Sequence, residues 1–148
     1  MKNVTIVEVI ALLFVVLFFY PGINKLLDYR LFKEQLLDNP MLKPVAGAII
    51  WGLPLTEFVV SLLLFIPKWR TKGLYASAIL MSLFTVYILL LLGFSSHIPC
   101  SCGGALSTLT WQQHIVFNLA WITLGIVAIV LDRRSKRFTT QNVINHSI

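Results

Sequence analysis

Four long apolar runs, separated by short polar stretches, constrain this chain more than any other feature of its sequence. They cover about residues 4–21, 45–66, 73–95 and 111–131. Each is close in length to the roughly 20 helical residues that cross a bilayer core of about 30 Å. Because lipid leaves backbone polar groups no outside partner, such runs fold as helices. The pattern predicts an all-α integral membrane four-helix bundle, with residues 1–132 as the transmembrane domain and 133–148 as a basic cytoplasmic tail.

The composition agrees with a membrane protein. Charged residues make up 12% of the chain and hydrophobic residues 57%, whereas an ordinary soluble domain carries about 25% charged residues. The net charge of +6 is therefore interpreted as a membrane-orientation signal, because Lys and Arg set the orientation of membrane spans. No basic run interleaved with aromatic residues indicates a nucleic-acid surface, so the expected environment is the lipid bilayer and no nucleic-acid partner is expected.

The distribution of Lys and Arg predicts which side is cytoplasmic. Four spans place both termini on one side of the membrane, together with the short loop between the second and third spans. Eight of the twelve Lys and Arg fall on that side, namely Lys2, Lys68, Arg70, Lys72, Arg133, Arg134, Lys136 and Arg137. By the positive-inside rule the termini are expected in the cytoplasm, and the loop before the fourth span is expected to face outward.

The stretch at residues 24–39 follows Pro21-Gly22, which is expected to end the first span. Here apolar and charged side chains interleave, a pattern typical of an amphipathic helix lying on the membrane surface. Asn39-Pro40 is expected to end this helix. The segment is interpreted either as a lid or partner-docking surface, or as a plain connector between the first two spans.

The only two cysteines, Cys100 and Cys102, lie one residue apart in the outward loop. A Cys-x-Cys pair can close a small ring whose strain makes the disulfide easier to reduce. The expected orientation puts the pair in an oxidising compartment, where disulfides persist. We therefore expect Cys100 and Cys102 to be the catalytic residues of a redox site. His97 is a supporting candidate, because a protonated imidazole favours a nearby thiolate.

Other interpretations of the cysteine pair remain open. A closed zinc site needs four ligands, and adding His97 and His114 gives a spacing that fits no standard finger. Copper(I) accepts soft thiolates at low coordination, so a copper-binding or transport protein is an alternative. The third interpretation is two inert thiols in a loop. No metal site is assigned from the sequence.

Glu57 lies near the middle of the second predicted span. An ionisable residue at this depth is costly and is by default a functional candidate. No Lys or Arg falls within the four predicted spans, so no cationic partner is expected for it. Glu57 is interpreted either as a proton relay or quinone ligand, or as a protonated carboxyl group bonded to Ser, Thr or Tyr of a neighbouring helix.

The fourth span has a defined start and a polar face. Thr110 and Gln113 fit a capping box, which predicts the helix start. Four residues then share one helical face, His114, Asn118, Trp121 and Gly125. This stripe is interpreted either as the lining of a quinone pocket, with Trp121 against the cofactor and His114 and Asn118 in support, or as the packing face of the helix.

Together these elements resemble the MauE branch of the DoxX-like membrane proteins, over about residues 4–131. The shared motifs are Pro21-Gly22-x-x-Lys25-Leu26, Pro54-x-x-Glu57 and Cys100-x-Cys102-Gly103. The resemblance implies a bacterial inner-membrane protein associated with thiol redox chemistry. Its type member supports the maturation of a disulfide-rich periplasmic enzyme and works with a thioredoxin-like partner. Gly103 departs from the pattern, since family members often carry an aromatic residue there.

Residues and resemblance together predict a membrane thiol-disulfide oxidoreductase. Cys100 and Cys102 would face the periplasm and exchange electrons with a thioredoxin-like protein, in support of periplasmic protein maturation. A quinone is the expected carrier in the membrane. Because better-known disulfide-generating enzymes of the four-helix type use two cysteine pairs, the single pair here must contact its partner directly or belong to a larger system. The alternatives are a non-enzymatic scaffold and the copper protein.

Overall fold

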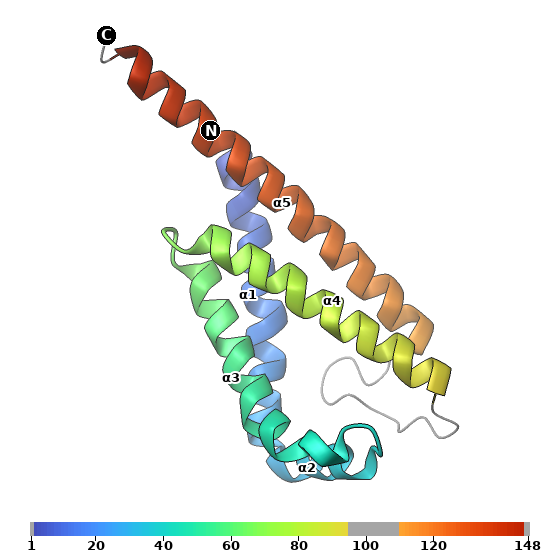
Figure 1. Cartoon of the computed structure of the whole chain (residues 1–148). Coiled ribbons are helices and arrows are strands. Elements are labelled where there is room, and N and C mark those ends of the chain that lie inside the picture. The colour runs from blue at the N-terminus through green and yellow to red at the C-terminus, as the bar shows by residue number, and fades with distance from the viewer. Residues whose placement is uncertain (1, 95–109, 147–148) are drawn as a thin grey trace.

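The computed structural model describes residues 2–94 and 110–146, and this part of the chain folds entirely as helices and their connections (Figure 1). The elements are α1 (Lys2–Leu27), α2 (Tyr29–Asp38), the 3-10 helix η1 (Lys43–Val45), α3 (Ala46–Phe65), α4 (Arg70–Phe94) and α5 (Trp111–His146). Four segments are long and apolar enough to cross a membrane, Val4–Leu27, Lys43–Phe65, Arg70–Gly93 and Gln112–Arg137. The predicted all-α fold with four spans is confirmed.

The four spanning helices pack side by side in a ring. α1 packs against α3 and α5, and α4 closes the ring by packing against α5 and α3. At one end the α1–α3 pair and the α4–α5 pair diverge, and α2 lies across the ends of α1 and α3 (Figure 1). The N-terminus, the α3–α4 connection and the C-terminal half of α5 lie toward the opposite end.

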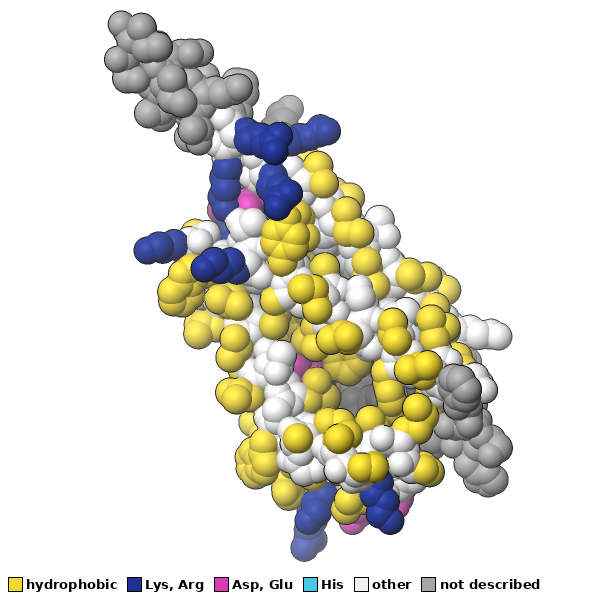
Figure 2. Space-filling view, in the orientation of Figure 1, with side chains coloured by type: hydrophobic (Ala, Val, Ile, Leu, Met, Phe, Trp, Pro, Cys, Tyr) yellow, Lys and Arg dark blue, Asp and Glu magenta, His cyan; other side chains and the backbone are white. Residues whose placement is uncertain are grey.

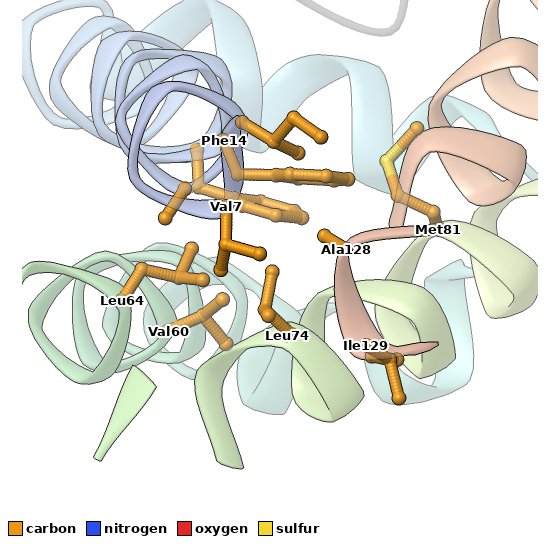
Figure 3. Packing of buried hydrophobic residues seen from close by; sticks show 11 residues of the cluster. Val7, Phe14, Val60, Leu64, Leu74, Met81, Ala128 and Ile129 are labelled. Atoms are coloured by element: carbon orange, nitrogen blue, oxygen red, sulfur yellow. The ribbon is translucent and has the colours of Figure 1, made fainter. Parts of the chain in front are cut away.

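The core forms where all four spans meet. Each contributes buried apolar side chains, among them Val7 and Phe14 of α1, Val60 and Leu64 of α3, Leu74 and Met81 of α4, and Ala128 and Ile129 of α5 (Figure 3). Outward-facing apolar residues such as Trp51 and Val116 stay exposed, as expected for a surface that meets lipid. Because lipid tails are as apolar as these side chains, close packing holds the helices together.

At the corner between α3 and α4, Gly73 of α4 lies directly against the backbone of α3. A Cβ atom on Gly73 would lie 2.8 Å from the backbone nitrogen of Leu64. Real Cβ atoms essentially never come that close, so only glycine fits here without moving the backbone. This absence of a side chain lets α4 start directly against α3.

The first span does not end at Pro21, and that prediction is wrong. α1 runs on to Leu27 with Pro21 inside it, and the carbonyl of Asn24 still accepts a helical bond from the amide of Asp28 at 2.8 Å. Membrane helices tolerate proline because neighbouring groups compensate for the missing hydrogen bond. The predicted amphipathic segment at 24–39 is therefore divided, since residues 24–27 complete α1 and α2 begins at Tyr29.

α2 directs its apolar side against the protein. Phe32 and Leu36, one helical turn apart, are buried with Ala46 and Ile50 at the start of α3. Asn39, which follows α2, is only 2% exposed. Its Nδ2 donates a 2.7 Å hydrogen bond to the hydroxyl of Tyr87 on α4. The α2 segment is thus packed on α3 and bonded to α4, across the end where the two helix pairs diverge.

α5 continues well past residue 131, where the fourth span was expected to end. Its 36 residues make a helix about 54 Å long, which exceeds a bilayer core of about 30 Å. Where α5 passes the start of α4, the hydroxyl of Thr71 donates to Asp132 at 2.5 Å. Lys136 lies 3.0 Å from the same carboxylate. The expected basic tail therefore begins as an extension of the helix.

Candidate functional site

The predicted redox residues Cys100, Cys102 and His97 lie outside the described residues. The segment that carries them joins Phe94, the last residue of α4, to Trp111, the first of α5. The predicted capping box at this start is confirmed. The amide of Gln113 donates to Thr110 Oγ1 at 3.3 Å, and the amide of Thr110 donates to Gln113 Oε1 at 2.9 Å. The helix that follows the cysteine pair therefore has a fixed starting point.

The charges of the folded bundle are asymmetric. Figure 2 shows Lys and Arg side chains gathered toward the end that carries the α3–α4 connection, with fewer at the α2 end. Some are matched locally, since Arg70 lies 3.3 Å from Glu8 and Arg133 lies over the ring of Tyr75 at 5.3 Å. The end of α4 and the start of α5 lie toward the less basic end, the end that also carries α2 (Figure 1). The asymmetry used to predict orientation is thus present in the folded bundle.

Glu57 forms an ion pair with Lys25 inside the bundle. Lys25 Nζ lies 2.6 Å from Glu57 Oε1, and the side chains are only 11% and 3% exposed. The expectation that Glu57 lacks a cationic partner is therefore wrong. It failed because α1 was expected to end at Pro21, which left Lys25 outside the span. Side chains of a helix lean toward its N-terminus, so Lys25 leans from the last turn of α1 back along the helix.

Gly22 makes room for the ion pair. A Cβ atom at this position would lie 3.4 Å from Glu57 Oε2 and 3.3 Å from the ring of Phe58. The ring of Phe58 in turn packs edge-on against Phe19, with centroids 5.5 Å apart. The two family motifs, Pro-Gly-x-x-Lys and Pro-x-x-Glu, therefore meet at one contact between α1 and α3. Lys25 is the functional candidate that sequence reasoning missed, and its place in the first motif was the available signal.

Within residues 2–94 and 110–146, no Ser, Thr or Tyr bonds the carboxylate of Glu57, which was the alternative interpretation. Ser61 donates to the backbone carbonyl of Glu57 at 2.8 Å, not to its carboxylate. Glu57 Oε2 is buried and has no hydrogen-bond partner within the described part of the chain. Buried carboxylate oxygens are nearly always bonded in folded proteins.

The polar stripe of α5 divides into two parts. Near the core, Trp121 meets Phe14 of α1 edge-on with centroids 4.9 Å apart, and a Cβ atom on Gly125 would lie 3.4 Å from the same ring. These two residues make the helix-packing contact that was one of the two interpretations. Nearer the start of α5, Asn118 is 5% exposed and His114 is half-buried.

Metal binding has no candidate among residues 2–94 and 110–146. No three His, Cys, Asp or Glu side chains come together there in a way that could hold an ion. The ligands considered for copper, Cys100, Cys102 and His97, lie in the segment between these two ranges. The described structure therefore adds nothing to a metal-binding interpretation.

Comparison with known proteins identifies one family. The model of the family described as methylamine utilisation protein MauE matches residues 3–131. The match covers the first three apolar helices, the segment that contains the two cysteines, and α5 as far as residue 131. No curated protein and no solved structure matches the chain.

Proposed function

Because the chain belongs to the MauE family of membrane proteins, we propose that it is a membrane thiol-disulfide redox protein. Cys100 and Cys102 exchange electrons with a periplasmic thioredoxin-like partner and support the maturation of periplasmic proteins. The four spans hold this pair at a bacterial inner membrane, with both termini in the cytoplasm.

One observation supports this proposal above the others. The segment with the cysteines leaves α4 at Phe94 and returns at Trp111, at the end of the bundle remote from the main Lys and Arg cluster (Figure 2). By the positive-inside rule that end faces away from the cytoplasm. Disulfide exchange with a secreted partner requires this side, because the cytosol keeps thiols reduced.

The exchange step balances without a further reactant. A thiolate of the pair attacks the partner's disulfide, and the bond between its two sulfurs breaks as a mixed disulfide forms. The second thiolate of the pair then attacks the mixed disulfide. The products are a Cys100–Cys102 disulfide and a reduced partner. Two electrons and two protons have moved, and the reverse reaction oxidises the partner by the same steps.

A second reaction must reset the pair. If the pair has become oxidised, it needs two electrons and two protons, and if reduced, it must lose them. A quinone–hydroquinone couple carries both in equal number and dissolves in the membrane, so we assign it as the carrier. His114, Asn118 and Trp121 on α5 were the expected quinone contacts, but Trp121 is engaged with Phe14 of α1.

Thiol trapping in intact cells tests the proposal. A bulky, membrane-impermeant alkylating reagent is expected to label Cys100 and Cys102 only after external reduction. In the Cys100→Ser/Cys102→Ser variant, the partner's ratio of dithiol to disulfide is expected to change, because the pair no longer exchanges electrons with it. Ser101→Ala is the matched control, since it alters the same tripeptide and keeps both thiols. If the partner's ratio of dithiol to disulfide is the same in the double variant as in the unaltered protein, the redox function is contradicted and a scaffold is favoured. Copper bound in stoichiometric amount would instead favour the metal-binding alternative.

A further inference from the structure

The seam between α4 and α5 brings cations together at the basic end of the bundle. Arg133 of α5 lies over the ring of Tyr75 on α4, with its Cζ 5.3 Å from the ring centroid. Lys72 lies three positions before Tyr75, and Arg137 lies four positions after Arg133. Residues at these spacings share one face of a helix. Because Arg133 stacks on Tyr75 across the seam, the two faces adjoin, and Lys72, Tyr75, Arg133 and Arg137 are here called the basic seam.

The basic seam is not neutralised by the acid beside it. Asp132 is the one Asp or Glu in the sequence of α4 and α5. Thr71 donates to its Oδ2 at 2.5 Å, and Lys136 lies 3.0 Å from the same oxygen. None of the three cations of the basic seam has an ion-pair partner among the described residues. Because like charges four positions apart destabilise a helix, the basic seam favours an anion from outside the chain.

The basic seam lies at the level of the lipid head groups. The membrane-spanning stretch of α4 begins at Arg70 and that of α5 ends at Arg137, and the apolar run of α5 stops at Leu131. All three cations are exposed, and Figure 2 shows Lys and Arg side chains on the surface at this end of the bundle. The anions that a bilayer offers at this level are lipid phosphates.

Toward the membrane core, the same two helical faces are apolar and exposed. The side chains that follow at helical spacing are Ile79 and Leu83 on α4, and Val130 and Ile126 on α5. All four are exposed. A head group held by the cations would therefore place its acyl chains against apolar side chains of both helices.

We propose that the basic seam binds the head group of an anionic phospholipid. Arg133 donates to the phosphate oxygens from the edge of its guanidinium group, because one face of that group is covered by the ring of Tyr75. Lys72 and Arg137 flank the phosphate and add charge from the two helices. Basic sites between membrane helices on the cytoplasmic side bind head groups of this kind.

The charges of the basic seam select an anionic lipid over a zwitterionic one. A zwitterionic head group carries its own cation next to the phosphate, and the three cations of the seam repel it. Each Lys or Arg near the membrane surface strengthens the attraction to anionic lipid about fivefold. The opposite end of the bundle provides a contrast, because Arg30 and Lys33 share α2 with Glu34 and Asp38.

Native mass spectrometry with lipid titration tests the site. The protein in detergent micelles is mixed with phosphatidylglycerol or phosphatidylcholine, and the dissociation constant of the first bound lipid is obtained from the adduct peaks. Phosphatidylglycerol is expected to bind about tenfold more tightly than phosphatidylcholine, or better. Arg133→Gln/Arg137→Gln is expected to raise the dissociation constant for phosphatidylglycerol about tenfold or more. Arg30→Gln/Lys33→Gln is the control, since it removes the same charge from α2, and it is expected to bind like the unaltered protein.

Tyr75 distinguishes a built site from general attraction by charge. Tyr75→Leu keeps the net charge but removes the ring under Arg133, so the dissociation constant for phosphatidylglycerol is expected to rise about two- to fivefold. Tyr75→Phe keeps the ring and is expected to bind normally. Equal binding of the two lipids, normal binding by Arg133→Gln/Arg137→Gln or by Tyr75→Leu, or an equal loss in the α2 control would overturn the site. The basic seam contains no cysteine, so these results do not depend on the proposed redox function.

Discussion

Lys25 Nζ and Glu57 Oε1 lie 2.6 Å apart although 32 positions separate the residues in the chain. The contact joins the end of α1 to the middle of α3. It also joins two short sequence motifs that are each too simple to be informative alone. Their meeting explains the glycine of the first motif, since Gly22 faces Glu57 Oε2 and Phe58.

Loss of one partner of this pair is expected to destabilise the bundle. Lys25→Met leaves the buried carboxylate of Glu57 without its cation, and breaking a buried pair in this way costs roughly 3–5 kcal/mol. Lys25→Met/Glu57→Met is expected to recover most of that loss, because no unpaired charge remains. Unfolding in mixed detergent micelles with increasing dodecyl sulfate, followed by circular dichroism, measures both. A double variant as unstable as the single one would show that the pair is not the source of the effect.

Gly73→Ala is expected to weaken the α3–α4 corner. The new Cβ would lie 2.8 Å from the backbone nitrogen of Leu64. Because backbone cannot move away as a flexible side chain can, overpacking is expected to lower the free energy of unfolding by about 1–3 kcal/mol. Gly52→Ala is the matched control on α3, where a Cβ meets nothing within 4 Å. In the same unfolding assay, Gly73→Ala should unfold at a lower dodecyl sulfate fraction than Gly52→Ala. Equal stability of the two would mean that the corner relaxes freely.

Trp121→Ala is expected to destabilise the bundle, on the order of 3 kcal/mol, because it empties the contact with Phe14. Trp51→Ala removes the same side chain from α3, where it is 64% exposed and its ring lies tilted against that of Tyr29, with centroids 5.6 Å apart. That change should cost about 1 kcal/mol. If Trp121→Ala instead keeps full stability and loses decylubiquinone binding, the α5 stripe is the ligand site and the packing interpretation is wrong.

The predicted orientation can be checked with single cysteines in the Cys100→Ser/Cys102→Ser background. Lys33→Cys on α2 is expected to react with a membrane-impermeant maleimide in intact cells. Lys68→Cys, on the connection between α3 and α4, is expected to react only after the membrane is opened, since it lies among the basic residues that the positive-inside rule keeps in the cytoplasm. The reverse pattern would contradict the orientation and, with it, the periplasmic cysteine pair.

The parts of the fold that depend on local sequence were predictable. Length and hydropathy are local properties, so four apolar runs predicted the four spans. A four-residue pattern likewise predicted Thr110 as the capping residue in front of α5. The end of α1 was not predictable in this way, because whether Pro21 stops a membrane helix depends on its neighbours in space.

The candidate site was harder to predict for the same reason. Periodicity shows which residues share a face, but not which helix meets that face, so it could not separate pocket from packing for Trp121. The bond between Asn39 and Tyr87 spans 48 positions, and no local pattern contains it. The depth of Glu57 in its span was enough to select it as a candidate, whereas its ion-pair partner followed only from the observed end of α1.

The Lys25–Glu57 pair also has a consequence for how the chain enters the membrane during synthesis. α1 emerges first, and until α3 arrives its lysine, near the helix end, can reach the lipid head groups. Glu57 lies in the middle of α3 and cannot reach the lipid head groups. An unpaired charge at that depth costs about 2.5–3.5 kcal/mol on insertion scales. We therefore expect insertion of α3 to be coupled to its docking on α1, with the two helices entering the bilayer as a hairpin in which Lys25 provides the counter-charge for Glu57.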